Sequence, residues 1–359
     1  MDSVMESNST SIDLISNIPK ELQSKILSYL PFKEAAATSI LSKSWRPVWS
    51  LRLSHHPSLS LDDRAQCPDS STFQQLVDAH LDESRLIGRL HLRSTSSATV
   101  LDHYDFGRWI DTAVQCEVEI LDLSAVRRDG GESKIPLVMT LDFASESMVV
   151  LRLEGISVMN YDIGCVRLPS LKILHFVDVR VQNGYCLSKF LRGSQTSLED
   201  LVLHGVRATD TIGECICRCS RFPKLMSVDI CSYFSFKRPS IGAFYNVESL
   251  KISPVTCEDP DNPFKTSKME FWSEPHNFHR CVSSQLRRCY LRGIYSDEDK
   301  ARVVPFAKYI LENGEVLETM TILCNNSHEK QIWMDQLVSH PRSSPTCELK
   351  LEVLEVHES

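Results

Sequence analysis

Leu171-Lys-Ile-Leu174-His-Phe176 and Leu198-Glu-Asp-Leu201-Val-Leu203 follow one pattern, in which an apolar residue recurs after three positions and again after two. The same pattern recurs at Ile87/Leu90/Leu92, Val118/Leu121/Leu123, Met148/Leu151/Leu153, Leu225/Val228/Ile230, Val247/Leu250/Ile252, Leu286/Cys289/Leu291 and Leu317/Met320/Ile322. Two apolar residues with one residue between them point to the same face of a β-strand, and the residue between them points to the opposite face. The nine copies therefore predict nine short strands, each with one buried face.

Nine copies, separated on average by fewer than about 30 residues, resemble a leucine-rich repeat array. Parallel strands in such an array form a concave sheet, and repeat proteins use that surface to bind partners. Candidates for target binding are therefore the outward strand positions Arg152, His175, Val202 and Asp229. Gly155, Gly205 and Gly293 follow three of the strands and would let the chain turn sharply. Scattered strands of an ordinary α/β domain would also match some of the copies.

Residues 12–55 predict a separate module of three short helices. Pro19 suits the first turn of a helix, where its missing N–H is not needed. Leu22 and Ile26 lie one helical turn apart on an apolar stripe, and Pro31 ends this helix. Three short helices bury little surface by themselves, so we expect an exposed apolar edge of the kind that docks on a partner. A helical hairpin packed on the rest of the chain is the alternative interpretation.

The order of residues in this module resembles an F-box of the plant type. The matching text is Ile15-Ser16, Ile18-Pro19, Glu21-Leu22, Ile26-Leu27-Ser28, Leu30-Pro31, Ala35, Thr38-Ser39, Leu41-Ser42-Lys43, Trp45-Arg46 and Trp49. Ile18 stands where leucine is usual, and Ser44 stands where arginine is usual. The resemblance implies binding to a Skp-type adaptor, which bridges to a cullin scaffold and a RING subunit. The adaptor contacts that it implies are Ile18, Pro19, Leu22, Ile26, Leu27, Leu30, Trp45 and Trp49.

Residues 297–359 predict a helix that ends near Gly314, a strand, a second helix and a last strand. The region resembles the FBD module of plant F-box/repeat proteins. The matching text is Tyr309-Ile310-Leu311-Glu312-Asn313, Val316-Leu317-Glu318, Met320-Thr321-Ile322, Pro341-Arg342-Ser343-Ser344 and Cys347. We expect an α+β cap that covers the open end of the array. The expected organisation is a disordered tail at 1–11, the F-box at 12–55, repeats at 56–296 with a Pro-rich loop near 254–278, and the cap at 297–359.

Composition and charge exclude several classes of protein. The net charge of −8 shows no basic excess for nucleic-acid binding. No run of about 18 apolar residues predicts a membrane span, and no secretory signal is present. We therefore expect an intracellular protein of the nucleus, the cytoplasm or both, with no nucleic-acid or membrane partner.

The thirteen cysteines do not predict a disulfide framework or a metal site. Cys215, Cys217 and Cys219 lack the loop spacing of a structural zinc site. Cysteines in apolar runs, such as Cys231 and Cys289, are expected to be small buried hydrophobic residues. We expect no metal and no cofactor.

The sequence contains no Gly-rich phosphate loop, metalloprotease helix or nucleophile elbow, so we name no catalytic residue. The resemblance implies the substrate-recognition subunit of a Skp–cullin–F-box ubiquitin ligase, with an unknown protein target. Two alternatives stay open. One is a non-catalytic repeat scaffold that acts outside a ligase, and the other is an enzyme that uses the region of Cys215 to Cys219.

Overall fold

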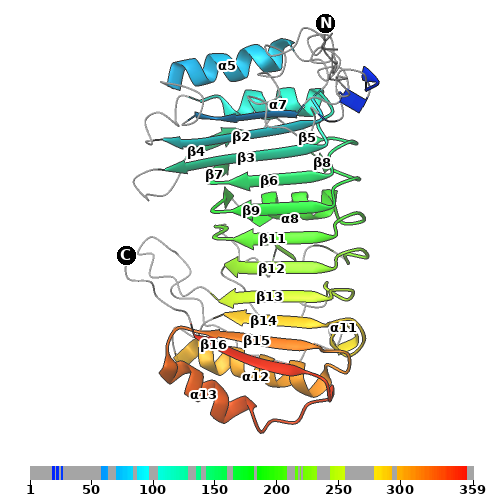
Figure 1. Ribbon diagram of the computed structural model, residues 1–359, viewed down its shortest axis with the longest axis vertical. Helices are drawn as coiled ribbons and strands as arrows, with labels where there is room; N and C mark the ends of the chain where they lie inside the picture. The colour runs from blue at the N-terminus through cyan, green and yellow to red at the C-terminus, as the bar shows by residue number, and fades with distance from the viewer. Residues whose placement is uncertain are drawn as a thin grey trace, which may run out of the picture.

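The structure is a computed structural model with a mixed α/β fold and a large parallel sheet (Figure 1). It describes residues 18–20, 22–23, 26, 58–63, 70–83, 87–96, 104–127, 135–138, 143–159, 165–181, 184–207, 215–216, 219, 221–232, 243–254, 279–292 and 297–353. The expected tail at 1–11 and the Pro-rich loop beyond Pro254 lie outside these residues.

The main sheet has eleven strands that follow one another in chain order, and every neighbouring pair is parallel. Its strands are β1 (Ser58–Asp62), β2 (Arg89–Ser96), β3 (Ile120–Arg127), β6 (Val150–Glu154), β9 (Ile173–Val177), β11 (Asp200–His204), β12 (Ser227–Ser232), β13 (Ser249–Pro254), β14 (Arg288–Arg292), β15 (Thr319–Cys324) and β16 (Glu348–Val353). All nine repeated triads end in a strand of this sheet, which confirms the nine predicted strands.

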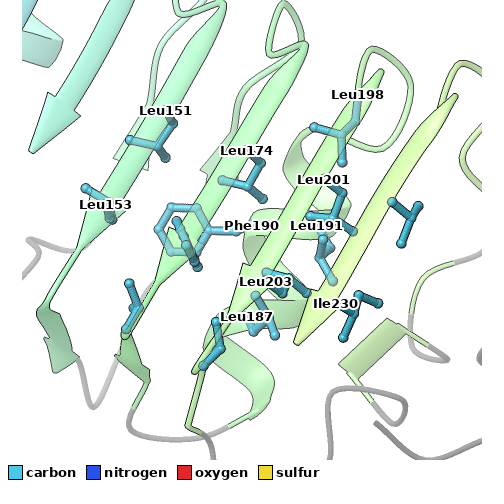
Figure 2. Packing of buried hydrophobic residues seen from close by; sticks show 14 of the residues in the cluster. Leu151, Leu153, Leu174, Leu187, Phe190, Leu191, Leu198, Leu201, Leu203 and Ile230 are labelled. Atoms are coloured by element: carbon cyan, nitrogen blue, oxygen red, sulfur yellow. The ribbon is translucent and has the colours of Figure 1, made fainter. Parts of the chain in front are cut away.

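Alternation of apolar and polar residues explains why each strand buries one face. The two inward residues of β9, Leu174 and Phe176, are fully buried, while His175 between them is half-buried on the other face. Figure 2 shows how the inward side chains of neighbouring strands meet the apolar side of helix α8 (Gly184–Gly193). Burial of each leucine contributes about 1.5–3 kcal/mol, so the repeated triads supply most of the stabilisation of the sheet.

The layer behind the sheet contains helices and two small sheets (Figure 1). The other helices are α5 (Ser70–Glu83), α7 (Phe106–Gln115), α11 (His279–Ser284), α12 (Asp297–Asn313) and α13 (Ser327–Leu337). The small sheets are formed by β4 (Ile135–Val138), β7 (Ile156–Met159) and β10 (Arg180–Val181), and by β5 (Phe143–Ala144) and β8 (Val166–Arg167). The indole Nε1 of Trp109 on α7 donates to Asp78 on α5 at 2.8 Å and ties these two helices together.

Three successive strands leave the main sheet through the same turn. Gly155 after β6, Asp178 after β9 and Gly205 after β11 all have positive φ angles, of 67°, 50° and 58°. The N–H of each turn residue donates to the next strand, with Gly205 reaching the carbonyl of Cys231 at 2.8 Å. The expected glycine turns are confirmed at Gly155 and Gly205, and Gly293 lies outside the described residues.

The region from residue 297, which was predicted as an α+β cap, contains two helices and two strands, and its strands extend the main sheet. β15 and β16 are the tenth and eleventh strands of this sheet, in register with β14. Helix α12 ends at Asn313, next to Gly314 as predicted, and lies behind the last strands, whereas α13 lies beside β16 at the end of the array (Figure 1). The predicted order of helix, strand, helix and strand is present, and the boundary of the cap at residue 297 stays a prediction.

Candidate interaction surface on the main sheet

We call the face of the main sheet that is turned away from α7 and α8 the front face (Figure 1). The middle residues of its strands form one continuous row across the sheet. In register order, this row contains Ser60, His91, Asp122, Arg152, His175, Val202, Asp229, Lys251, Tyr290, Thr321 and Lys350. The four predicted target-binding candidates are consecutive members of this row and are all half-buried. The structure therefore brings them together on one surface.

One polar network runs along the row from β2 to β11. His91 Nδ1 and Arg152 Nη1 lie 3.3 Å and 3.7 Å from the same Asp122 oxygen. The Nε of Arg152 donates to His175 Nδ1 at 3.3 Å, and His175 Nε2 lies 2.8 Å from Asp200 Oδ2. Because Nδ1 of His175 accepts, the neutral tautomer with a proton on Nε2 satisfies both contacts. This hydrogen bond from His175 lowers the pKa of the Asp200 carboxyl.

A second network joins β11, β12 and β13. His204 Nε2 lies 2.8 Å from Asp229 Oδ1, and Lys251 Nζ lies 3.4 Å from Asp229 Oδ2. Burial raises the pKa of Asp229, but the hydrogen bond from His204 and the nearby charges of His204 and Lys251 outweigh it and lower the pKa overall. Both aspartates are therefore held as carboxylates by cationic or N–H donor partners from neighbouring strands.

Val202 separates the two networks. It is the middle residue of β11, between His175 and Asp229 in the register. Val177 and Ile173, on the adjacent β9, are also half-buried on the front face. The centre of the surface is therefore a small apolar patch with an imidazole–carboxylate pair on each side.

Three further residues of this surface, Asp200, His204 and Lys251, were not among the predicted candidates. Each of them occupies an outward strand position, so the alternation within the repeats is a signal that could have marked them. Which aspartate each imidazole reaches depends on the register between strands, and the repeat pattern alone does not give that register.

Four arginines on the front face extend its charge to both sides of these networks. Arg89 and Arg93 lie on β2, and Arg288 and Arg292 lie on β14. None of the four forms an ion pair with a described residue, and the buried Nε of Arg292 has no hydrogen-bond partner there. The surface thus has cationic side chains on β2 and β14 and carboxylates in the region between these strands. This distribution of charge favours a partner with charges of both signs.

Half of the predicted adaptor contacts lie in the described part of the chain. Pro19 accepts hydrogen bonds from the N–H groups of Leu22 and Gln23 at 3.0 Å, so a helix starts after Pro19 as predicted. Leu22 and Ile26 are 53% and 45% exposed, and Ile18 is half-buried. The other four predicted contacts, Leu27, Leu30, Trp45 and Trp49, lie outside the described residues.

The cysteines of the alternative enzyme hypothesis are core residues. Cys215 is fully buried, Cys219 is 5% exposed, and Cys217 lies outside the described residues. Burial raises the pKa of the Cys281 and Cys289 thiols to about 12, so these groups are not thiolates at neutral pH. Cys231 differs from the prediction because its outward strand position leaves it half-buried on the front face.

The described residues contain no group of three or more histidine, cysteine, aspartate or glutamate side chains that could hold a metal ion. No helix among them is long and apolar enough to span a membrane.

Two family models match separate parts of this chain. A family model of the F-box domain matches residues 15–56, and a family model of the FBD matches residues 274–322. The FBD match includes α11, β14, α12 and part of β15, and it begins before the predicted boundary at residue 297. The domain boundaries themselves stay predictions.

Several curated proteins of Arabidopsis thaliana are similar to this chain. One F-box/FBD/LRR-repeat protein is 34% identical over 53% of this chain and 40% of its own length. A second is 34% identical over 53% of this chain and 43% of its own length. A third is 25% identical over 97% of this chain and 78% of its own length. The matched segments of the first two therefore cover less than half of each relative.

Proposed function

Because the chain belongs to the F-box/FBD/leucine-rich-repeat family of plant proteins, we propose that it is a substrate-recognition subunit of a Skp–cullin–F-box ubiquitin ligase. The observation that carries the proposal is the F-box match at residues 15–56, together with the exposure of Leu22 and Ile26 within it. F-box domains generally bind Skp-type adaptors. Two large apolar side chains one helical turn apart and exposed to solvent are suited to such a contact.

In this proposal the F-box is a three-helix module that docks on the adaptor, and the adaptor links it to a cullin and a RING subunit. The sequential parallel sheet is the strand layer of a leucine-rich repeat solenoid. Its front face binds the protein target near Arg152, His175, Val202 and Asp229. The mixed charge and the apolar centre of this face support a folded or extended protein segment as its ligand.

The chain itself performs no chemistry in this proposal and acts by placing the target near the ubiquitin-carrying subunits. Burial of Cys215 and Cys219 supports this view because a thiol that is closed off from solvent is poorly accessible to a substrate or a metal ion. We also propose that it works inside the cell, in the nucleus, the cytoplasm or both.

Co-purification with a Skp-type adaptor tests the proposal. We expect the full chain to retain the adaptor and the double variant L22D/I26D to lose it, because two carboxylates would be buried without partners at the contact. Y185D is the matched control, since Tyr185 is a 54% exposed apolar residue on α8, outside the F-box. Thermal unfolding of all three proteins checks that the fold is intact.

Retention of the adaptor by folded L22D/I26D would contradict the predicted contacts. Failure of the unmodified chain to bind any Skp-type adaptor would contradict the ligase assignment and favour a repeat scaffold that acts outside a ligase.

A further inference from the structure

We infer that β16 is a self-association edge, through which two copies of this chain join their main sheets into one continuous sheet. β16 is the last strand of the sheet order, and among the described residues no strand lies on its outer side. It contains six residues without proline or a bulge. An open, regular strand edge is the backbone template on which another strand adds.

The backbone directions of β16 determine which residues offer hydrogen bonds at this edge. The N–H of Glu348 donates at 2.9 Å to the carbonyl of Glu318, the residue directly before β15. In a parallel pair, backbone groups of alternate residues point to the same side. Those of Lys350 and Glu352 therefore also point to β15, whereas those of Leu349, Leu351 and Val353 point to the free edge.

In an antiparallel contact between two β16 strands, residues that face the free edge must pair with residues that also face it. The two-fold axis therefore passes between two copies of the same residue. With the two-fold axis at Leu351, Leu351 pairs with Leu351 of the second copy, and Leu349 pairs with Val353. These are hydrogen-bonded pairs, because all three residues direct their backbone groups outward. The axis is perpendicular to the sheet, so the contact is isologous and closes at two copies.

The charges of β16 and the position of Pro345 together select this register. With the axis at Leu351, Lys350 stands opposite Glu352 of the second copy, and the symmetric pair forms as well. These are non-hydrogen-bonded positions, where opposite side chains lie closest. An axis at Lys350 would place like charges opposite each other, Lys350 against Lys350 and Glu348 against Glu352, so this register is disfavoured. An axis at Leu349 would extend the pairing to Pro345, which has no N–H to donate.

The back of this edge carries incompletely buried apolar surface. The inward residues Leu349, Leu351 and Val353 are only half-buried, in contrast to the fully buried inward residues of β15. Helix α13 packs against β16 and carries exposed apolar residues near its end. Met334 within the helix is 39% exposed, and Val338 at its C-cap, one turn later, is 53% exposed. A two-fold axis perpendicular to the sheet places both α13 helices on the same side of the joined sheet. Association would therefore cover apolar surface as well as backbone groups.

A charge-swap experiment on the full chain tests this edge. The molar mass is measured by light scattering and by sedimentation across a concentration series up to about 100 µM, where a moderate isologous contact is populated. We expect twice the 40.8 kDa of one chain for the unmodified protein. K350E and E352K each replace two attractive pairs with two repulsive pairs, so each should weaken the dimer about tenfold or more. The double variant K350E/E352K restores opposite charges and should restore the dimer.

The matched control is R288E, because Arg288 is an exposed cation on the front face that lies two strands from β16. Its mass should equal that of the unmodified protein, and circular dichroism checks the fold of every variant. A monomer at every concentration, or dimers that persist in both single variants, would overturn the inference. A double variant that remains monomeric would overturn the Leu351-centred register and with it the proposed edge. None of these outcomes depends on adaptor binding.

Discussion

His175 and His204 hold neighbouring strands together by the same diagonal contact. Each imidazole reaches an aspartate that lies two residues before its register partner on the next strand, Asp200 for His175 and Asp229 for His204. Protonation of His175 would turn its Nδ1 into a donor that faces the Arg152 guanidinium. The first network is therefore complete with a neutral imidazole and an ionised Asp200, and its contribution to stability depends on the charge of that carboxylate.

Replacement of Asp200 by asparagine tests this dependence. The pKa of Asp200 is lower in the folded chain, so its stabilisation is present above the unfolded pKa of about 3.9 and is lost as the pH falls through the folded pKa. We expect D200N to lower the free energy of unfolding by about 1 kcal/mol at pH 7, and the difference should shrink between pH 5 and pH 3. Urea unfolding of both proteins measures it. E315Q, at an exposed glutamate, is the control, and an equal loss at pH 3 would refute the explanation.

The repeated turn at the strand ends was predicted where it contains glycine and was not predicted where it contains aspartate. Gly155 and Gly205 were predicted as turn residues because glycine adopts positive φ without strain. Asp178 occupies the same position after β9, and aspartate tolerates this conformation through its short polar side chain. A β-carbon on Gly205 would collide with the Asp178 carboxylate, so the two turns are packed against each other.

Substitution of Gly205 by alanine should therefore destabilise the fold by about 1–3 kcal/mol, through positive φ and the collision with Asp178. Removal of the colliding side chain should recover part of this loss, so D178G/G205A is expected to be more stable than G205A. D178G alone is the control for the loss of the aspartate. Chemical unfolding of the four proteins gives the coupling energy. Additive effects of the two substitutions would show that the turns do not interact.

The periodic pattern was sufficient to predict nine strands but missed elements that break it. β1 has the inward pair Leu59 and Leu61, but His56 stands where the triad needs its first apolar residue. The strands of the small sheets, such as β10, have two to four residues, so tertiary contacts and not local pattern decide their pairing. Strand periodicity was sufficient to predict that Arg152 and Asp229 lie on the same face of the sheet. Their ionic partners could not be predicted, because these depend on the register between strands.

At the scale of the whole molecule, each main-sheet strand pairs only with its neighbours in chain order. Stability of such an array is the sum of the stability of its units and of the contacts between neighbours. The polar networks connect β2 through β13 in the same neighbour-to-neighbour way. A defect in a central strand should thus weaken nearby strands before distant ones.

Leu201 on β11 is a suitable position for such a defect because it is fully buried. We expect L201A to lower the free energy of unfolding by about 2–5 kcal/mol, from lost apolar burial and the resulting cavity. Hydrogen exchange of backbone amides should show the largest loss of protection in β9, β11 and β12, with β2 and β15 much less affected. V202A is the matched control, because it changes the next residue of the same strand on the half-exposed front face. Uniform loss of protection from β2 to β15 would mean that the sheet unfolds as a single cooperative unit, against the neighbour-by-neighbour account.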